Sequence, residues 1–377
     1  MRRLHTRQVT LFAAFIPGFY NGVMVRVTLP LADSPNPLTA PDRPVTGPRD
    51  LRAVRTLRIS VTDRCNFRCV YCMPQDKIDG VRRERLLSFE EIAIVARTAV
   101  GLGITAFKIT GGEPLVRHDL AKLIAQLKVM PGCTELSMTT NGALLAREAD
   151  RLRAAGLDRL TVSLDTLDAD RFRRITRGAD IDEVLRGINA AVRAGFRHPK
   201  INCVAMRGIN DDEFADFAAL TLETDVTVRF IEYMPLGRTA LGGEYEQRFI
   251  SEQGIRDRIA ARLGNLAPSE RDTGHGPAAV WRVPGARGRI GFISAMSRPF
   301  CETCNRLRLT AEGQLRSCLF DGGEVELRPI LRLARPDGSR GYADANAALS
   351  EAFDRCVAFK PKAHSHYGNR QMSQIGG

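Results

Sequence analysis

The chain has 377 residues, enough to bury a large core, and one barrel-sized domain plus a smaller one is the natural division. Its formal net charge is +12, from 55 basic and 43 acidic residues. The basic residues are scattered, without runs or interleaved aromatic residues, which argues against nucleic-acid binding. Nine cysteines without a convincing secretory signal indicate a reducing compartment, the cytoplasm, and no apolar run is long enough to span a membrane.

The first 50 residues differ in composition from the rest. Residues 1–26 carry four arginines and no acidic residue, and residues 29–48 contain six prolines, which exclude a regular helix or a central strand. A basic start without acidic residues is compatible with an organellar transit peptide. Because serine is scarce there, we expect residues 1–50 to be a disordered extension or the product of an overcalled start site.

Three cysteines follow the first predicted strand, residues 56–62: Cys65, Cys69 and Cys72. Thiolates so close in sequence can bind the irons of one iron–sulfur cluster, and a four-iron cluster needs four ligands. The loop offers three, so one iron would keep an open position, as a catalytic metal site requires. A zinc loop or a run of buried thiols is the alternative, but zinc loops usually come as two matched cysteine pairs.

A second motif follows the next predicted strand, residues 107–110, and consists of Gly111, Gly112, Glu113 and Pro114. Two glycines let the backbone come close to a ligand, and Glu113 can then hold a cationic amino group such as that of methionine. Alone, Gly-Gly before Pro is also an ordinary turn. Here the motif follows the three-cysteine loop by one strand–helix unit. Together, the loop and the motif form a pattern that resembles the radical S-adenosylmethionine (SAM) superfamily.

Short β-branched runs alternate with amphipathic helices through the rest of this region. Further strands are predicted at residues 136–140, 160–164, 200–205 and 227–233, and helices at about 88–102, 119–129, 143–155, 181–194 and 211–222. Ser88 and Glu91 match a capping box, and Gly103, Gly156 and Gly195 fall where helix C-caps are expected.

Six strand–helix units in sequence predict an α/β fold with a parallel sheet. Six is short of the eight that close the usual barrel, so we expect a partial, open β/α barrel of about six strands. Functional residues should then lie at the carboxyl ends of the strands, where both motifs fall. Two later strand ends carry small polar residues, near Thr139 and Ser163, which fit helix capping as well as ligand binding.

Another cysteine triplet, Cys301, Cys304 and Cys318, lies after the predicted barrel. It is again one ligand short of a four-iron cluster, and a zinc site completed by a distant Cys356, His364 or His366 is the alternative. Arg306 and Arg308 stand beside it, two residues apart. In an extended segment they project to the same side, and their forked guanidinium groups suit phosphate oxygens, although solvated surface charge would look the same.

With both triplets considered, the chain resembles the GTP 3′,8-cyclase family of molybdenum cofactor biosynthesis from about residue 57 to residue 377. Segments 57–65 and 229–234, the second cysteine segment and residues 372–377 carry the resemblance. It implies a radical SAM partial barrel in residues 51–270 and a smaller C-terminal α+β domain with a second cluster in residues 271–377. It also implies an enzyme, a lyase, that cyclises GTP to (8S)-3′,8-cyclo-7,8-dihydroguanosine 5′-triphosphate with SAM and two [4Fe–4S] clusters.

The resemblance also implies roles for single residues. The ligands of the SAM-binding cluster correspond to Cys65, Cys69 and Cys72, and those of the second cluster, whose open iron faces guanine, to Cys301, Cys304 and Cys318. SAM contacts correspond to Tyr71, Gly112, Ser163 and Met234. GTP contacts correspond to Arg58, Lys108, Thr139, Lys200, Arg306 and Arg308. Gly376 and Gly377 correspond to a tail that reaches into the active site and is needed for catalysis.

Two features depart from the family pattern: Lys108 stands where many members have arginine, and residues 1–50 have no counterpart. Cys133, Cys203 and Cys356 lie outside both triplets and are expected to be ordinary reduced thiols, with Cys203 buried in the fifth strand.

The resemblance implies GTP as substrate, an electron donor such as a flavodoxin or ferredoxin, and a downstream cyclic pyranopterin monophosphate synthase, and it is compatible with a homodimer. The main alternative is another radical SAM enzyme with an auxiliary cluster, such as a peptide maturase. Those typically carry more C-terminal cysteines and a peptide-recruiting element, which the sequence does not show. An iron–sulfur or zinc protein that binds RNA is the non-enzymatic alternative.

Overall fold

The structure, a computed structural model, describes residues 48–76, 80–241, 245–270, 276–320, 323–332, 342–365 and 367–376, with only the backbone of 342–344. Of the predicted extension, residues 1–50, only the last three are therefore described. Gly377 and His366 also lie outside the described residues.

One twelve-stranded sheet organises the described part of the chain, in the order β12-β11-β10-β1-β2-β3-β4-β5-β6-β9-β8-β7. The strands are β1 (Thr56–Ser60), β2 (Ala106–Thr110), β3 (Glu135–Thr140), β4 (Arg159–Ser163), β5 (Lys200–Ala205), β6 (Thr227–Glu232), β7 (Ala267–Pro268), β8 (Ala279–Arg282), β9 (Arg289–Ile293), β10 (Arg306–Leu309), β11 (Gln314–Arg316) and β12 (Glu324–Glu326). The first six are the strands predicted from sequence. Because the order begins at β12 and ends at β7, these strands form an open barrel, which confirms the predicted fold class.

The C-terminal region extends the barrel at both edges. Strands β1 to β6 pair in parallel, and β10 and β9 continue the parallel pairing beyond β1 and β6. Antiparallel strands then finish each edge, β11 and β12 on one side and β8 and β7 on the other. The pairing of β10 with β1 brings the second cysteine segment to the first strand of the barrel.

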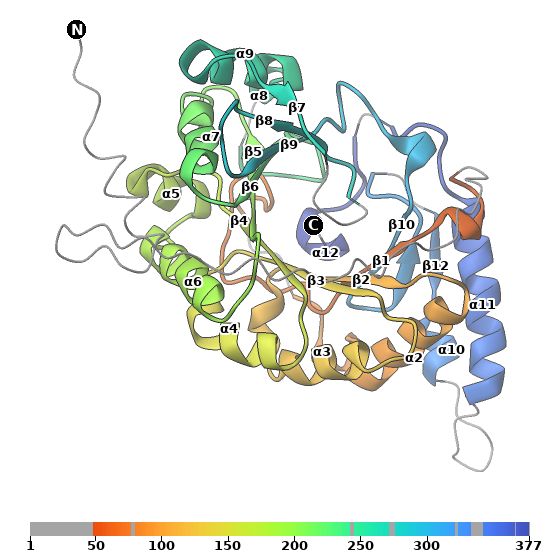
Figure 1. Ribbon diagram of the computed structural model, residues 1–377. Coiled ribbons are helices and arrows are strands. Elements are labelled where there is room, and N and C mark those ends of the chain that lie inside the picture. Colours follow the sequence, from red (N-terminus) through yellow and green to blue (C-terminus); the bar gives the residue numbers. More distant parts are fainter. Residues whose placement is uncertain are drawn as a thin grey trace, which may run out of the picture.

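The helices lie outside the ring of strands (Figure 1). They are α2 (Phe89–Gly101), α3 (Leu120–Lys128), α4 (Leu145–Ala154), α5 (Ala169–Thr176), α6 (Ile181–Arg193), α7 (Phe214–Glu223), α8 (Tyr245–Arg248), α9 (Glu252–Leu263), α10 (Arg328–Arg332), α11 (Tyr342–Ala358) and α12 (Met372–Ile375), with short 3-10 turns η1 (Leu51–Ala53), η2 (Arg83–Arg85), η3 (Pro114–Val116) and η4 (Cys301–Thr303). The exception is α12, which lies in the middle of the ring beside the C-terminus (Figure 1). Among the described helices, none combines the length and apolar character needed to cross a membrane.

Local signals predicted from sequence are present at the helix ends. Ser88 and Glu91 form both hydrogen bonds of a capping box at the start of α2. Gly103, Gly156 and Gly195 adopt positive φ angles of 87°, 95° and 86° after α2, α4 and α6, a conformation that glycine adopts without steric cost.

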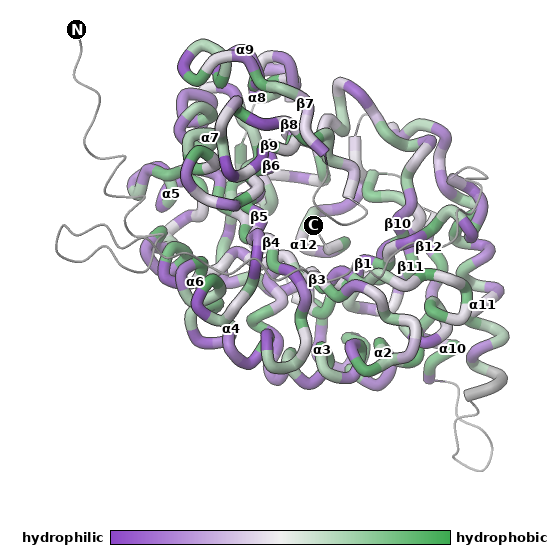
Figure 2. Tube along the Cα trace, viewed as in Figure 1, coloured by the Kyte–Doolittle hydropathy of each residue, from purple (hydrophilic) through white to green (hydrophobic). Residues whose placement is uncertain are grey.

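The hydrophobic core lies between the strands and the helices rather than inside the barrel. On β1, Leu57 and Ile59 are fully buried in this core, while Arg58 between them faces the interior cavity. The helices alternate hydrophobic and hydrophilic residues along their length (Figure 2), and α2 buries Ile92 and Val95. Because neighbouring side chains on a strand point to opposite faces, the polar residues of the strands, such as Arg58, Lys108 and Thr161, face the barrel interior together with a few apolar ones, such as Val204 and Ile231.

Candidate active site

A cavity of about 350 Å³ occupies the barrel interior. Every residue that the sequence predicted to bind a cluster, SAM or GTP lines this cavity: Arg58, Cys65, Cys69, Tyr71, Cys72, Lys108, Gly112, Thr139, Ser163, Lys200, Met234, Cys301, Cys304, Arg306, Arg308 and Cys318. They come from strands and loops up to 260 residues apart in sequence, so the fold brings both triplets and the basic residues to one space.

The first triplet follows β1 and lies in a buried and partly anionic environment. Burial raises the pKa of Cys65 to about 11, of Cys72 to about 12, and of Cys69 well above its usual value. The carboxylates of Glu113, near Cys65, and Asp165, near Cys69 and Cys72, raise these pKa values further. A metal bound here would have to displace protons from the thiols.

The Gly-Gly-Glu motif packs its backbone directly against the segment that leads into this triplet. A Cβ on Gly112 would lie 2.4 Å from the Arg64 carbonyl oxygen, so only glycine fits. Glu113 accepts hydrogen bonds from the Thr140 hydroxyl (2.7 Å) and the Asn141 backbone N–H (2.6 Å). Burial raises the pKa of Glu113 to about 7. The motif therefore presents a fixed carboxyl group to the cavity.

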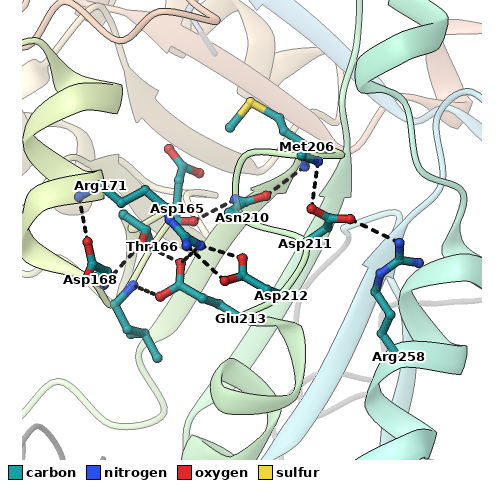
Figure 3. A network of polar contacts seen from close by, with 12 residues as sticks. Asp165, Thr166, Asp168, Arg171, Met206, Asn210, Asp211, Asp212, Glu213 and Arg258 are labelled. Atoms are coloured by element: carbon teal, nitrogen blue, oxygen red, sulfur yellow. Dashed lines mark hydrogen bonds and ion pairs between the residues drawn. The ribbon is translucent and has the colours of Figure 1, made fainter. Parts of the chain in front are cut away.

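Asp165, beyond the end of β4, supplies a second buried carboxyl group beside the triplet. It accepts hydrogen bonds from the Val204 backbone N–H (2.8 Å) and the Tyr71 hydroxyl, and burial raises its pKa to about 6. The Asn210 amide donates to the Asp165 carbonyl oxygen at 2.6 Å, and Glu213 accepts from Thr166 (Figure 3). The loop after β5 thus fixes the end of β4. Asn210 and Glu213 carry no sequence signal that distinguishes them from ordinary loop residues.

A second group of cavity residues is cationic: Arg58, Lys108, Arg229 and Arg308, which we call the cationic wall. In the register of the sheet, Arg58 on β1 is level with Lys108 on β2 and with Arg308 on β10, so their side chains share one face. Lys108 and Arg229 both donate to the Thr161 hydroxyl, at 3.3 and 3.1 Å. Arg229 is a cavity residue to which sequence reasoning gave no role, although it begins the recognised 229–234 segment.

Burial and mutual repulsion make these cations costly without an anion. Burial and neighbouring cations lower the pKa values of Arg58 and Lys108 well below their usual values, and the pKa of Arg308 to about 9. Burial lowers the pKa of Arg229 to about 10. Within the described residues, the buried Thr139 hydroxyl has no hydrogen-bond partner, although it lines the cavity. Because buried cations are costly without an anion and a buried hydroxyl is normally paired, this wall and the Thr139 hydroxyl fit a polyanionic ligand.

The second triplet lies beside this wall and in a more cationic environment than the first. Cys304 is 3.4 Å from the Lys360 ammonium and 3.7 Å from the Arg306 guanidinium. Burial acts to raise the pKa of Cys304, but these two cations outweigh burial and lower it to about 6. Burial raises the pKa of Cys301.

The donor chemistry of both triplets fits iron–sulfur clusters. All nine cysteines are free, so the thiols are not consumed in disulfides. Across the described ranges, no three Cys, His, Asp or Glu side chains converge closely enough to hold a single metal ion. A four-iron cluster does not require such convergence, because each cysteine binds a separate iron.

The C-terminal tail, with α12, lies inside the ring of strands (Figure 1). The Gly376 carbonyl oxygen accepts a hydrogen bond from Arg308, and the Ser373 backbone N–H donates to Cys72. Gly376 has a φ of 71°, and a Cβ there would lie 2.4 Å from the Thr110 hydroxyl oxygen. Glycine is therefore required by both conformation and space. The tail links a residue of the first triplet to the cationic wall.

Two protein families match successive parts of the chain. Residues 59–221 match the radical SAM superfamily, and residues 226–366 match the Molybdenum Cofactor Synthesis C family. The chain is 45% identical over 331 residues to a GTP 3′,8-cyclase of Moorella thermoacetica and 44% identical over 330 residues to one of Pelotomaculum thermopropionicum. Each match covers 86% of this chain and 98% of the relative.

Solved structures resemble the fold more distantly. SuiB of Streptococcus suis bound to S-adenosylmethionine matches with a TM-score of 0.54 and 13% identity, over 81% of this chain and 67% of SuiB. SuiB bound to its precursor peptide SuiA matches with a TM-score of 0.55 and 13% identity, over 81% and 66%. At this identity the likeness shows the fold alone.

Proposed function

Because the chain belongs to the GTP 3′,8-cyclase family, we propose that its cavity cyclises GTP to (8S)-3′,8-cyclo-7,8-dihydroguanosine 5′-triphosphate. This reaction is the first step of molybdenum cofactor biosynthesis. One observation carries the proposal for this chain: a buried cationic wall lies in the same cavity as two separate cysteine triplets. Two clusters at the triplets and a triphosphate at the wall would use all three features.

The enzymes of this family use SAM and [4Fe–4S] clusters. When bound, these groups would supply one-electron radical chemistry at the 3′ carbon of the GTP ribose. Cys65, Cys69 and Cys72 would hold the first cluster and leave one iron for SAM. Glu113 suits the cationic amino group of SAM because its carboxyl group is buried and fixed by hydrogen bonds.

The residues proposed to contact SAM surround that position: Tyr71, Gly112, Ser163 and Met234. Gly112 allows close backbone approach, and the Tyr71 side chain is fixed by Asp165. A bound sulfonium would also offset the negative charge of the two carboxyl groups. This part of the cavity therefore suits a cationic cofactor.

The GTP site would lie between the two triplets. Cys301, Cys304 and Cys318 would hold the second cluster. The proposed GTP contacts are Arg58, Lys108, Thr139, Lys200, Arg306 and Arg308, to which the cavity geometry adds Arg229. These donors would anchor the triphosphate and so hold the ribose and the base in position for ring closure.

We propose that Gly376 and Gly377 act as part of the catalytic site. Support comes from the hydrogen bond between Arg308 and Gly376 and from the tight space around Gly376. A tail in this position would help to exclude water from the reacting radical and would orient Arg308 toward the substrate. Gly377 enters this proposal through the family resemblance.

Other components follow from the chemistry. A one-electron donor such as a flavodoxin or ferredoxin would reduce the first cluster, and a cyclic pyranopterin monophosphate synthase would consume the product. Nine reduced thiols support a reducing compartment, the cytoplasm.

The deciding experiment is anaerobic incubation of the reconstituted protein with GTP, SAM and a reductant, followed by product identification. Roughly eight irons per chain are expected from two four-iron clusters. The cyclised GTP should form only with all three components, while GDP and guanosine should bind progressively worse because they offer fewer phosphate contacts. About four irons, stoichiometric zinc, or equal binding of guanosine and GTP would contradict the proposal.

A further inference from the structure

We infer that Lys360 is a positioning residue for the second triplet: its buried ammonium compensates the negative charge of the Cys304 sulfur and raises the reduction potential of the cluster bound there. The inference rests on the proposed function, because it requires that cluster.

The backbone around Lys360 is fixed from two directions. Lys360 follows the end of α11, and its N–H donates to the Val357 carbonyl oxygen at 3.0 Å. Its own carbonyl oxygen accepts a hydrogen bond from Arg49 at 2.9 Å. These contacts direct the side chain inward, where the residue is only 2% exposed and its Nζ lies 3.4 Å from the Cys304 sulfur.

The surroundings of Lys360 identify its charge partner. In the described part of the chain, Lys360 forms no ion pair with a carboxylate, and its Nζ contacts the Cys304 sulfur. A buried ammonium is costly unless an anion compensates it. A cluster-bound thiolate is such an anion. The buried positive charge of Lys360 is therefore compensated when the Cys304 sulfur is ionised.

Lys360 differs from Arg306, the other cation in contact with Cys304. Arg306 lines the cavity, whereas Lys360 is not among the residues that line it. Lys360 can therefore influence the reaction only through the cluster and its ligand. Reduction adds one negative charge to the cluster, and a nearby cation stabilises the reduced form more than the oxidised form, which raises the potential.

The test is an EPR-monitored redox titration of the full-length protein in which Cys65, Cys69 and Cys72 are replaced by alanine, so that only the second cluster contributes. In this background, Lys360→Gln removes the charge, Lys360→Arg keeps it, and Lys362→Met removes an exposed charge two residues away. We expect Lys360→Gln to shift the reduction equilibrium at least tenfold toward the oxidised form, about 59 mV for one electron. Lys360→Arg and Lys362→Met should leave the potential nearly unchanged.

Each outcome decides the inference. Loss of the second cluster from Lys360→Gln but not from Lys360→Arg also assigns the role to the charge. The inference would be overturned by an unchanged potential in a fully loaded Lys360→Gln protein. It would also be overturned if Lys360→Gln and Lys360→Arg shifted the potential equally, or if both lost the cluster. A background protein without about four irons would instead contradict the proposed function, since the unmodified triplet would then hold no cluster.

Discussion

The two cysteine triplets offer the same donors in opposite electrostatic environments. Around the first, burial and two carboxyl groups, Glu113 and Asp165, keep the thiol pKa values high. Around the second, Arg306 and Lys360 lower the pKa of Cys304 to about 6. Because neighbouring charges tune a metal centre, we infer that the two triplets have different tasks: the anionic environment would suit a cationic cofactor, and the cationic environment would suit an anionic substrate.

Replacing each triplet separately should have the largest effect, because it tests whether the two triplets have different tasks. A protein with Cys65, Cys69 and Cys72 changed to alanine should lose SAM cleavage entirely, because no iron remains to bind SAM. A protein with Cys301, Cys304 and Cys318 changed to alanine should still cleave SAM but lose GTP binding and cyclisation. Formation of 5′-deoxyadenosine, measured beside product formation, separates the two.

Iron analysis supplies the control for both triplet variants. Each should retain roughly four of about eight irons, because each keeps one complete site. If the second-triplet variant lost SAM cleavage as well while keeping four irons, the proposed division of tasks would be wrong.

Removing the tail should have the next largest effect, because it contacts both regions. Deletion of Gly376 and Gly377 should lower cyclisation on the order of 100-fold, about 2.7 kcal/mol in the barrier, while iron content and SAM binding stay nearly intact. Gly376→Ala should give an intermediate loss, since its Cβ would collide with Thr110 at a positive φ. Product formation at the full-length rate after the deletion would contradict the proposed role.

Sequence reasoning predicted strands β1 to β6 and both triplets because these depend on local patterns: alternating hydrophobicity, closely spaced cysteines and paired glycines. It did not predict β7 to β12. It did not predict that β9 and β10 extend the parallel sheet, because that pairing joins segments far apart in the chain. It also gave no role to Arg229 or Lys360, since a single basic residue acquires significance only from its buried neighbours. The proposed division at residue 270 stays a prediction, as one sheet runs across it.

A smaller effect should follow from changes in the cationic wall. Lys108→Met removes one buried charge of this wall, and a charge-assisted phosphate contact contributes roughly 1.5–3 kcal/mol, so GTP binding should weaken about tenfold or more. Lys108→Arg should retain binding, since it keeps the charge. Calorimetry with GTP measures both, and Lys122→Met, on the exposed face of α3, is the matched control. SAM binding should not change in any of the three, because the two regions recognise different charges.

The smallest expected effect is a pH dependence confined to the first region. Burial raises the pKa of Glu113 to about 7, so at pH 6 the carboxyl group is mostly protonated and at pH 7 it is about half ionised. Only the ionised form attracts the cationic amino group of SAM. The apparent affinity is the intrinsic affinity multiplied by the fraction of protein in the competent form, so SAM binding should strengthen about fivefold from pH 6 to pH 7.

Binding of SAM should also release protons over this range, because it favours the carboxylate form of Glu113. Glu113→Gln should bind weakly at both pH values and lose most of the pH dependence, since only Asp165, whose pKa burial raises to about 6, would still titrate beside the site. Asp168→Asn, changed at the exposed start of α5, should behave like the unmodified protein. Calorimetric titration in buffers of different ionisation enthalpy measures both affinity and proton release. A pH-independent affinity in the unmodified protein would show that Glu113 does not hold the amino group, and the anionic character of this region would then need another explanation.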